Sequence, residues 1–120
     1  LIEYNDFIHE IKHAFYSLWE FPSGIQQSYK ANIIININYS GWINADEVSF
    51  QTKFAHPQEY EMRESIDSLI GKIAYIKFIL PDFIKLQIPE SNRADYIFPL
   101  SFEIDSGVVA RANNRLKAES

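Results

Sequence analysis

The feature that most constrains the fold is an alternation of apolar and polar side chains between Ala31 and Phe54. A repeat of two residues is typical of a β-strand with one buried face. Gly41 and Trp42 interrupt the alternation, which indicates a turn between two strands. The predicted inward side chains are Ile33, Ile35, Ile37 and Tyr39 in the first strand and Val48, Phe50, Thr52 and Phe54 in the second. Because a two-stranded ribbon is marginal alone, the rest of the chain must cover this face or add strands.

A helix is predicted on each side of this hairpin. Residues 5–20 repeat apolar side chains every three or four positions, and Pro22 follows directly as a stop signal. A second helix is predicted over residues 58–70, with Gly71 as its C-terminal stop. Residues 73–80 are rich in β-branched and aromatic side chains, which favours a strand, and a helix that continues to the end of this segment is the alternative.

Two further strands are predicted near the C-terminus, at residues 84–88 and 96–104. Pro99 has no amide proton to give to a ladder, so the second of these is expected at a sheet edge or at a bulge. The sequence therefore predicts an α+β fold: an antiparallel sheet of four to five strands with an N-terminal helix and a second, shorter helix packed on one face. We expect residues 1–106 to form a single domain and residues 107–120 to form a weakly helical or frayed basic tail.

Composition narrows the classes of function. The 120 residues carry a net charge of −5, which argues against a nucleic-acid or anionic-membrane binder because both need concentrated Lys and Arg. The absence of cysteine excludes disulfides, thiolate zinc sites and a cysteine nucleophile. It also favours a cytoplasmic location, since small secreted domains commonly depend on disulfides. The first 106 residues hold eight basic residues against fifteen acidic ones, a net charge of −7.

The segment from His9 to His13 spells H-E-x-x-H, the pattern of zinc peptidases. Histidines four apart share one helix face and can share a metal, and Glu10 between them can act as a general base. Lys12, however, stands where such helices keep uncharged residues. A third ligand would have to come from later in the chain: His56, Glu59 or Glu64. We therefore expect an exposed helix face with no cofactor, and keep His9 and His13 as weak candidates for metal ligands.

The combination of small size, acidic surface and no assembled catalytic group indicates a small protein-binding or inhibitory module for a basic partner. Its most concrete form is a bacterial cytoplasmic immunity protein that neutralises a basic, nuclease-like toxin. The predicted partner contacts are acidic or aromatic side chains expected at the surface: Tyr16, Trp42, Glu59, Glu61, Glu64 and Asp67.

Two other functions stay open. The first alternative is a small-ligand-binding or enzymatic domain in which a curved sheet forms a cup. The aromatic side chains that could line such a cup are Tyr39, Phe54, Phe78, Phe98 and Phe102. The second alternative is a zinc hydrolase that uses residues 9–13.

Overall fold

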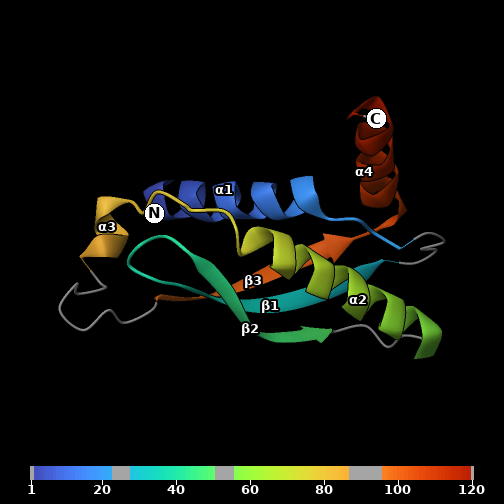
Figure 1. The fold of residues 1–120 in the computed structure, drawn as a ribbon, viewed down its shortest axis with the longest axis horizontal. Helices are drawn as coiled ribbons and strands as arrows, with labels where there is room; N and C mark the ends of the chain where they lie inside the picture. Colours follow the sequence, from blue (N-terminus) through green and yellow to red (C-terminus); the bar gives the residue numbers. More distant parts are fainter. Residues whose placement is uncertain (1, 23–27, 51–55, 87–95, 120) are drawn as a thin grey trace.

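The computed structural model describes residues 2–22, 28–50, 56–86 and 96–119, and it shows helices packed against one antiparallel sheet (Figure 1). The elements in chain order are α1 (Ile2–Leu18), β1 (Tyr29–Ile37), β2 (Ile43–Phe50), α2 (His56–Ile73), α3 (Asp82–Lys85), β3 (Tyr96–Ile104) and α4 (Ser106–Glu119). The predicted α+β class, with an antiparallel sheet and an N-terminal helix, is confirmed. None of the described helices is both long enough and apolar enough to cross a membrane.

The sheet has β1 at its centre. In the described part of the chain the strand order is β2-β1-β3, and both neighbours run antiparallel to β1. An isolated antiparallel bridge between Trp42 and Lys77 joins a fourth short segment to the turn of the hairpin. β3 lies at an edge, as Pro99 predicted, because an edge strand needs ladder bonds on one side only.

A β-bulge in β2 keeps the apolar side chains of the hairpin on one face. Ile35 pairs with Ala45 and Ile34 pairs with Glu47, so β2 advances two residues while β1 advances one. Asp46 is the additional residue. The bulge brings Ile43 and Ala45 onto the same face as Val48 and Phe50, although the two pairs differ in sequence parity. Of the predicted inward set, Thr52 and Phe54 lie outside the described residues.

The core lies between the sheet and the two long helices, α1 and α2 (Figure 1). Ile33, Ile35 and Ile37 of β1 are fully buried, which confirms the predicted inward face of the first strand. The Phe15 ring of α1 stacks on the Phe102 ring of β3, with centroids 5.4 Å apart. Full burial of such side chains contributes about 1.5–3 kcal/mol each, which makes this layer the main source of stability.

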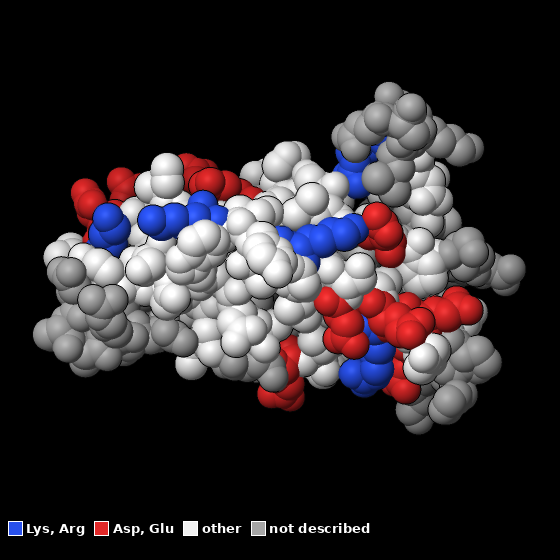
Figure 2. All heavy atoms as spheres, in the orientation of Figure 1, with Lys and Arg blue, Asp and Glu red and all other residues white. Residues whose placement is uncertain are grey.

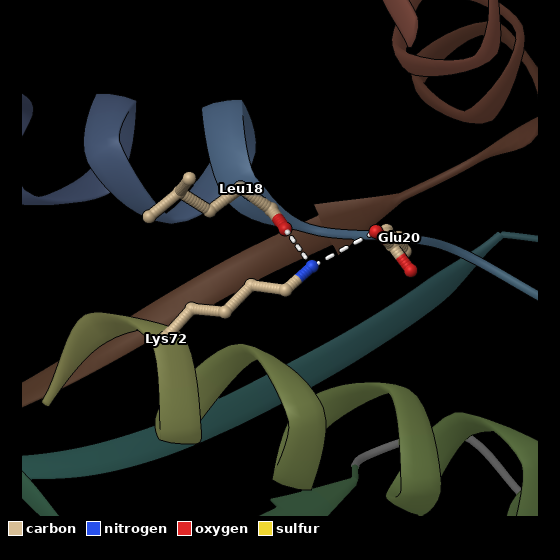
Figure 3. Close-up of polar contacts among 3 residues, drawn as sticks. All are labelled: Leu18, Glu20 and Lys72. Carbon is tan, nitrogen blue, oxygen red and sulfur yellow. Dashed lines mark hydrogen bonds and ion pairs between the residues drawn. The ribbon is translucent and has the colours of Figure 1, made fainter. Parts of the chain in front are cut away.

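A charged contact joins the C-terminal ends of the two long helices (Figure 3). Lys72 Nζ lies 2.9 Å from Glu20 Oε1 and also donates a hydrogen bond of 3.5 Å to the Leu18 carbonyl oxygen. A cation at this place satisfies a carbonyl at the end of α1 and opposes the negative end of its dipole. The contact therefore links the C-terminal end of α2 to the end of α1.

The predicted helix stop at Gly71 is wrong, because α2 continues to Ile73. Ile66, Leu69 and Ile73 are buried at helical spacing, so packing outweighs the cost of about 1 kcal/mol of a glycine in a helix. The strand predicted over residues 73–80 is also absent: a turn follows α2, and Lys77 contributes only the bridge to Trp42.

The predicted strand at residues 84–88 begins instead as helix α3. Pro81 starts this turn, since its carbonyl accepts hydrogen bonds from the amides of Ile84 and Lys85. Ile84 is buried while Leu86 is 85% exposed, so the expected two-residue alternation is absent over residues 84–86. Residues 87 and 88 of the predicted strand lie outside the described residues. The tail predicted over residues 107–120 as weakly helical or frayed belongs, as far as it is described, to helix α4 (Ser106–Glu119), which packs through buried Val109 and Ala112.

Candidate functional site

The acidic side chains of α2 lie on its outer side. Met62, Ile66 and Leu69 face the core at helical spacing and are buried. The positions on the opposite side of the helix therefore face solvent. We call the exposed set formed by Tyr60, Glu61, Glu64 and Asp67 the acidic face of α2. Figure 2 shows acidic groups gathered over the N-terminal part of this helix, with one basic group among them.

Glu59 differs from the other predicted carboxylates. Its Oε1 lies 3.7 Å from Nη2 of Arg63, one helical turn later. The Arg63 guanidinium also lies over the Phe50 ring, 4.9 Å from its centroid. Glu59 is half-buried and already shares a cation, so it contributes less free negative charge than Glu61, Glu64 or Asp67.

Tyr60 is the aromatic member of this surface. Its side chain is 61% exposed. A hydrogen bond to the Glu64 carboxylate, one turn away, raises the pKa of the Tyr60 hydroxyl. The spacing of four residues between Tyr60 and Glu64 was the available signal for this pair. The aromatic ring therefore lies exposed beside the carboxylates.

Trp42 lies apart from the acidic face of α2. It is 41% exposed and follows the hairpin turn, where its amide donates a 3.0 Å hydrogen bond to Asn38 Oδ1. In Figure 1 this turn lies at the opposite end of the sheet from the first turns of α2. The segment that follows α2 also contacts this turn, because the Phe78 amide donates a 2.8 Å hydrogen bond to the Gly41 carbonyl. The structure does not bring Trp42 together with the acidic contacts.

Tyr16 was predicted to face water, and the structure corrects this. The side chain is half-buried, with its ring 5.4 Å from the Phe102 ring in an edge contact. Its hydroxyl donates a 3.3 Å hydrogen bond to the Glu103 carbonyl. Burial is the main cause that raises the pKa of Tyr16. The reason is that α1 lies along β3, so the side of α1 that carries Tyr16 meets the end of that strand.

His9 and His13 are both exposed on α1. Within the described ranges, no group of three His, Cys, Asp or Glu side chains converges as a metal site would require. Glu59 and Glu64, two of the suggested third ligands, lie on α2, and nothing is described for the side chain of His56. His9, Glu10 and His13 are exposed, whereas Ile11 of the same segment is buried in the core.

The aromatic residues proposed for a ligand cup mostly fill the core. Phe98 and Phe102 are fully buried, and Phe98 packs on Phe7 of α1 with ring centroids 5.9 Å apart. Phe78 is also buried, Tyr39 is half-buried, and Phe54 lies outside the described residues. The inner face of the sheet is therefore occupied by α1 where the cup would open.

A pocket of about 520 Å³ lies instead between α1 and α4. We call it the α4 pocket, and its lining residues are Tyr16, Phe21, Val108, Arg111, Ala112 and Arg115. Nη1 of Arg115 donates a 3.0 Å hydrogen bond to the Tyr16 carbonyl oxygen, across 99 positions of sequence. Nε and Nη2 of the same guanidinium are buried and find no hydrogen-bond partner among the residues that the structure describes. No local pattern in the sequence indicates this pocket, apart from the basic character of the last residues.

Comparisons of the chain with protein-family models, with curated proteins and with solved structures find no match. The functional argument therefore rests on the residues of this chain. Two features of the surface are candidate sites: the acidic face of α2 and the α4 pocket. They lie on different helices.

Proposed function

We propose that this domain binds a basic partner protein through the acidic face of α2. The observation that supports the proposal is the uncompensated charge of Glu61, Glu64 and Asp67. All three carboxylates are exposed on one side of the helix, and none of them forms an ion pair within the part of the chain that the structure describes. A cluster of one sign on a rigid helix favours encounter with a surface of the opposite sign.

Tyr60 is the residue of this surface that we expect to slow dissociation of the partner. Exposed carboxylates chiefly speed association, whereas aromatic side chains buried at an interface slow dissociation. Tyr60 is 61% exposed and lies one helical turn from Glu64, so a partner can bury its ring beside the carboxylates. The proposed contact therefore has an aromatic anchor with carboxylates around it.

The specific form that we propose is a cytoplasmic bacterial immunity protein for a basic, nuclease-like toxin. The net charge of −7 over the first 106 residues supports a partner that is strongly basic. Trp42 joins the same interface only if the partner extends along the sheet, because the hairpin turn lies at its far end. Tyr16, half-buried beside β3, offers less of its ring to a partner than Tyr60 does.

The test is co-purification of the partner from the native host, followed by association kinetics at increasing ionic strength. A variant that neutralises the acidic face of α2 carries Glu61→Gln, Glu64→Gln and Asp67→Asn. The matched control removes three exposed charges of the same sign from α1: Glu3→Gln, Asp6→Asn and Glu10→Gln. Both variants have the same net charge, so they separate a local surface from the overall charge.

We expect the α2 variant to associate about tenfold more slowly at low salt and the α1 control to change by less than about twofold. Tyr60→Ala is expected to raise the dissociation rate with little effect on association. Equal effects of the two charge variants would contradict the proposed surface. Failure to recover any basic partner from the host would contradict the proposed function itself.

A further inference from the structure

A further pocket lies beside the hairpin turn, and we call it the hairpin pocket. It is lined by Tyr39 and Ser40 of the turn, by residues 77–80 and by Lys85 of α3. Its volume of about 490 Å³ lies within the range of about 300–1,000 Å³ that small-molecule sites occupy. In Figure 1 the hairpin turn and α3 lie at the same end of the molecule, away from α4 and from the first turns of α2. The hairpin pocket is therefore separate from the α4 pocket and from the acidic face of α2.

Backbone contacts between two segments hold one wall of this pocket in place. Trp42 and Lys77 form an isolated antiparallel bridge. Beside the bridge, the Phe78 amide donates a 2.8 Å hydrogen bond to the Gly41 carbonyl. The turn and the segment after α2 therefore present their side chains to the pocket from fixed backbone positions.

The floor of the hairpin pocket is apolar. Buried and exposed side chains alternate along the segment after α2, so that Phe78 and Leu80 are buried. Ile79 between them is 86% exposed and stands at the rim. Tyr39, half-buried on the opposite segment, adds an aromatic ring. This lining suits the apolar body of a small ligand.

Lys77 and Lys85 bring two positive charges to the same pocket. Both side chains are exposed, and neither forms an ion pair with a residue that the structure describes. Unlike the buried Nε and Nη2 of Arg115, these side chains are open to a ligand. The described lining contains no carboxylate, and Tyr39 and Ser40 add two hydroxyl groups. The polar part of the pocket therefore suits a group with several hydrogen-bond acceptors.

Carboxylates lie near the hairpin pocket but line a different one. Asp82 stands on α3, three residues before Lys85, and belongs to the lining of that other pocket. The other acidic residues there are Glu3, Asp6 and Glu10. These charges repel an approaching anion, so long-range attraction does not bring a ligand to the hairpin pocket. Binding must come from direct contact with the two ammonium groups and the apolar floor.

From these features we infer that the hairpin pocket binds a small phosphate monoester with an apolar body. The phosphate contacts Lys77 and Lys85, and the apolar body lies against residues 78–80. A phosphate monoester carries a charge of about −1.5 to −2 near pH 7 and three acceptor oxygens, so it can use two point charges at once. A carboxylate carries one charge and pairs best with the fork of an arginine, which the described lining does not contain. This inference goes beyond the proposed function and does not depend on it.

The experiment titrates the full chain with phenyl phosphate by isothermal titration calorimetry near neutral pH. Inorganic phosphate supplies the charge alone, phenol supplies the ring alone, and phenylacetate replaces the phosphate with a carboxylate. The backbone amide resonances of Ser40 and Ile79 give a local readout by NMR. Sedimentation with phosphatidylcholine vesicles, with and without phosphatidic acid, distinguishes a lipid headgroup from a free ester as the source of the phosphate.

We expect phenyl phosphate to bind at least about tenfold more tightly than any of the three comparison probes. Lys77→Gln and Lys85→Gln should each weaken it about fivefold or more, because each removes one direct charged contact. Ile79→Ala should weaken phenyl phosphate and leave inorganic phosphate unchanged. Asp82→Asn should strengthen binding by about twofold, since it removes a repelling charge. Arg111→Gln, which removes an exposed charge from α4 at the other end of the molecule, is the matched control and should change the affinity by less than about twofold.

Inorganic phosphate that binds as tightly as phenyl phosphate would overturn the inference, since the apolar floor would then play no part. Equally tight binding of phenylacetate would overturn the assignment of a phosphate. Lysine variants that behave like Arg111→Gln, or amide shifts confined to other parts of the chain, would also contradict the site. Sedimentation only with vesicles that carry phosphatidic acid, lost in Lys77→Gln, would assign the monoester to a lipid. If neither phenyl phosphate nor these vesicles bind, the inference is wrong.

Discussion

The indole nitrogen of Trp19 donates a 3.2 Å hydrogen bond to the hydroxyl oxygen of Ser65, and this joins the end of α1 to the middle of α2. The Ser65 hydroxyl in turn donates to the Met62 carbonyl at 2.8 Å, so its geometry is fixed by its own helix. Trp19 is completely buried. Its N–H therefore depends on Ser65 for a partner.

Ser65→Ala should lower the free energy of unfolding by about 1–3 kcal/mol, because it leaves a buried indole donor unsatisfied. The matched control is Ser68→Ala, which changes an exposed serine in the same helix and has the same effect on helix propensity. The control should stay within about 0.5 kcal/mol of the wild type. Urea unfolding measures both, and equal effects would show that the Trp19 contact adds nothing.

Gly41→Ala should destabilise the hairpin turn by at least about 2 kcal/mol. Gly41 has φ +96, and a Cβ there would lie 2.0 Å from the Phe78 carbonyl oxygen. Gly71→Ala is the matched control, because nothing lies within 4 Å of its added Cβ and the residue is inside α2. It should stabilise by about 0.5–1 kcal/mol. Thermal unfolding of the two variants should shift in opposite directions, and a shared direction would contradict the turn geometry.

Asp105→Ala should cost about 0.5–2 kcal/mol, since the Asp105 side chain caps α4 through its 2.8 Å hydrogen bond from the Val108 amide. Asp105→Asn keeps an acceptor of the same shape and should retain most of that stability. Because α4 supplies Arg111 and Arg115, amide hydrogen exchange in this helix should quicken in the alanine variant. Similar exchange in both variants would show that capping does not hold α4.

We expect the raised pKa of Tyr16 to make the protein less stable in alkaline solution. Its pKa is raised in the folded protein, mainly by burial, so folding holds the proton more tightly than the unfolded chain does. The stability contribution is complete below the ordinary tyrosine pKa of about 10 and declines as the pH rises through the raised value. Tyr16→Phe should therefore flatten the fall in unfolding midpoint above about pH 10. Profiles of variant and wild type that fall in parallel would contradict this.

The hairpin and α1 could be predicted because their patterns are long and their burial is regular. Ile33, Ile35 and Ile37 alternate over a strand whose inward face is completely buried, and Pro99 identified an edge strand correctly. The carboxylates of α2 could be predicted to lie outward for the same reason, since the apolar positions of that helix occupy the other side.

Helix α3 and the α4 pocket depend on contacts between distant residues, which a local sequence pattern does not indicate. Ile84 and Leu86 alternate like a strand, but three residues cannot distinguish a strand from the helical turn that Pro81 starts. The α4 pocket could not be predicted, because it depends on a hydrogen bond from Arg115 to the Tyr16 carbonyl, and these residues are 99 positions apart in the sequence. Nothing near Tyr16 in the sequence indicates that α4 covers it.

The bulge at Asp46 makes the hairpin tolerant of a change in length. Removing Asp46 would convert β2 into a regular strand in which Ala45 and Val48 stay on the inner face, because the two-residue step opposite Ile34 and Ile35 becomes a single one. In a regular strand, the loss of one residue moves every later side chain to the opposite face of the sheet. Here a shortened relative could keep the same core with a straighter edge.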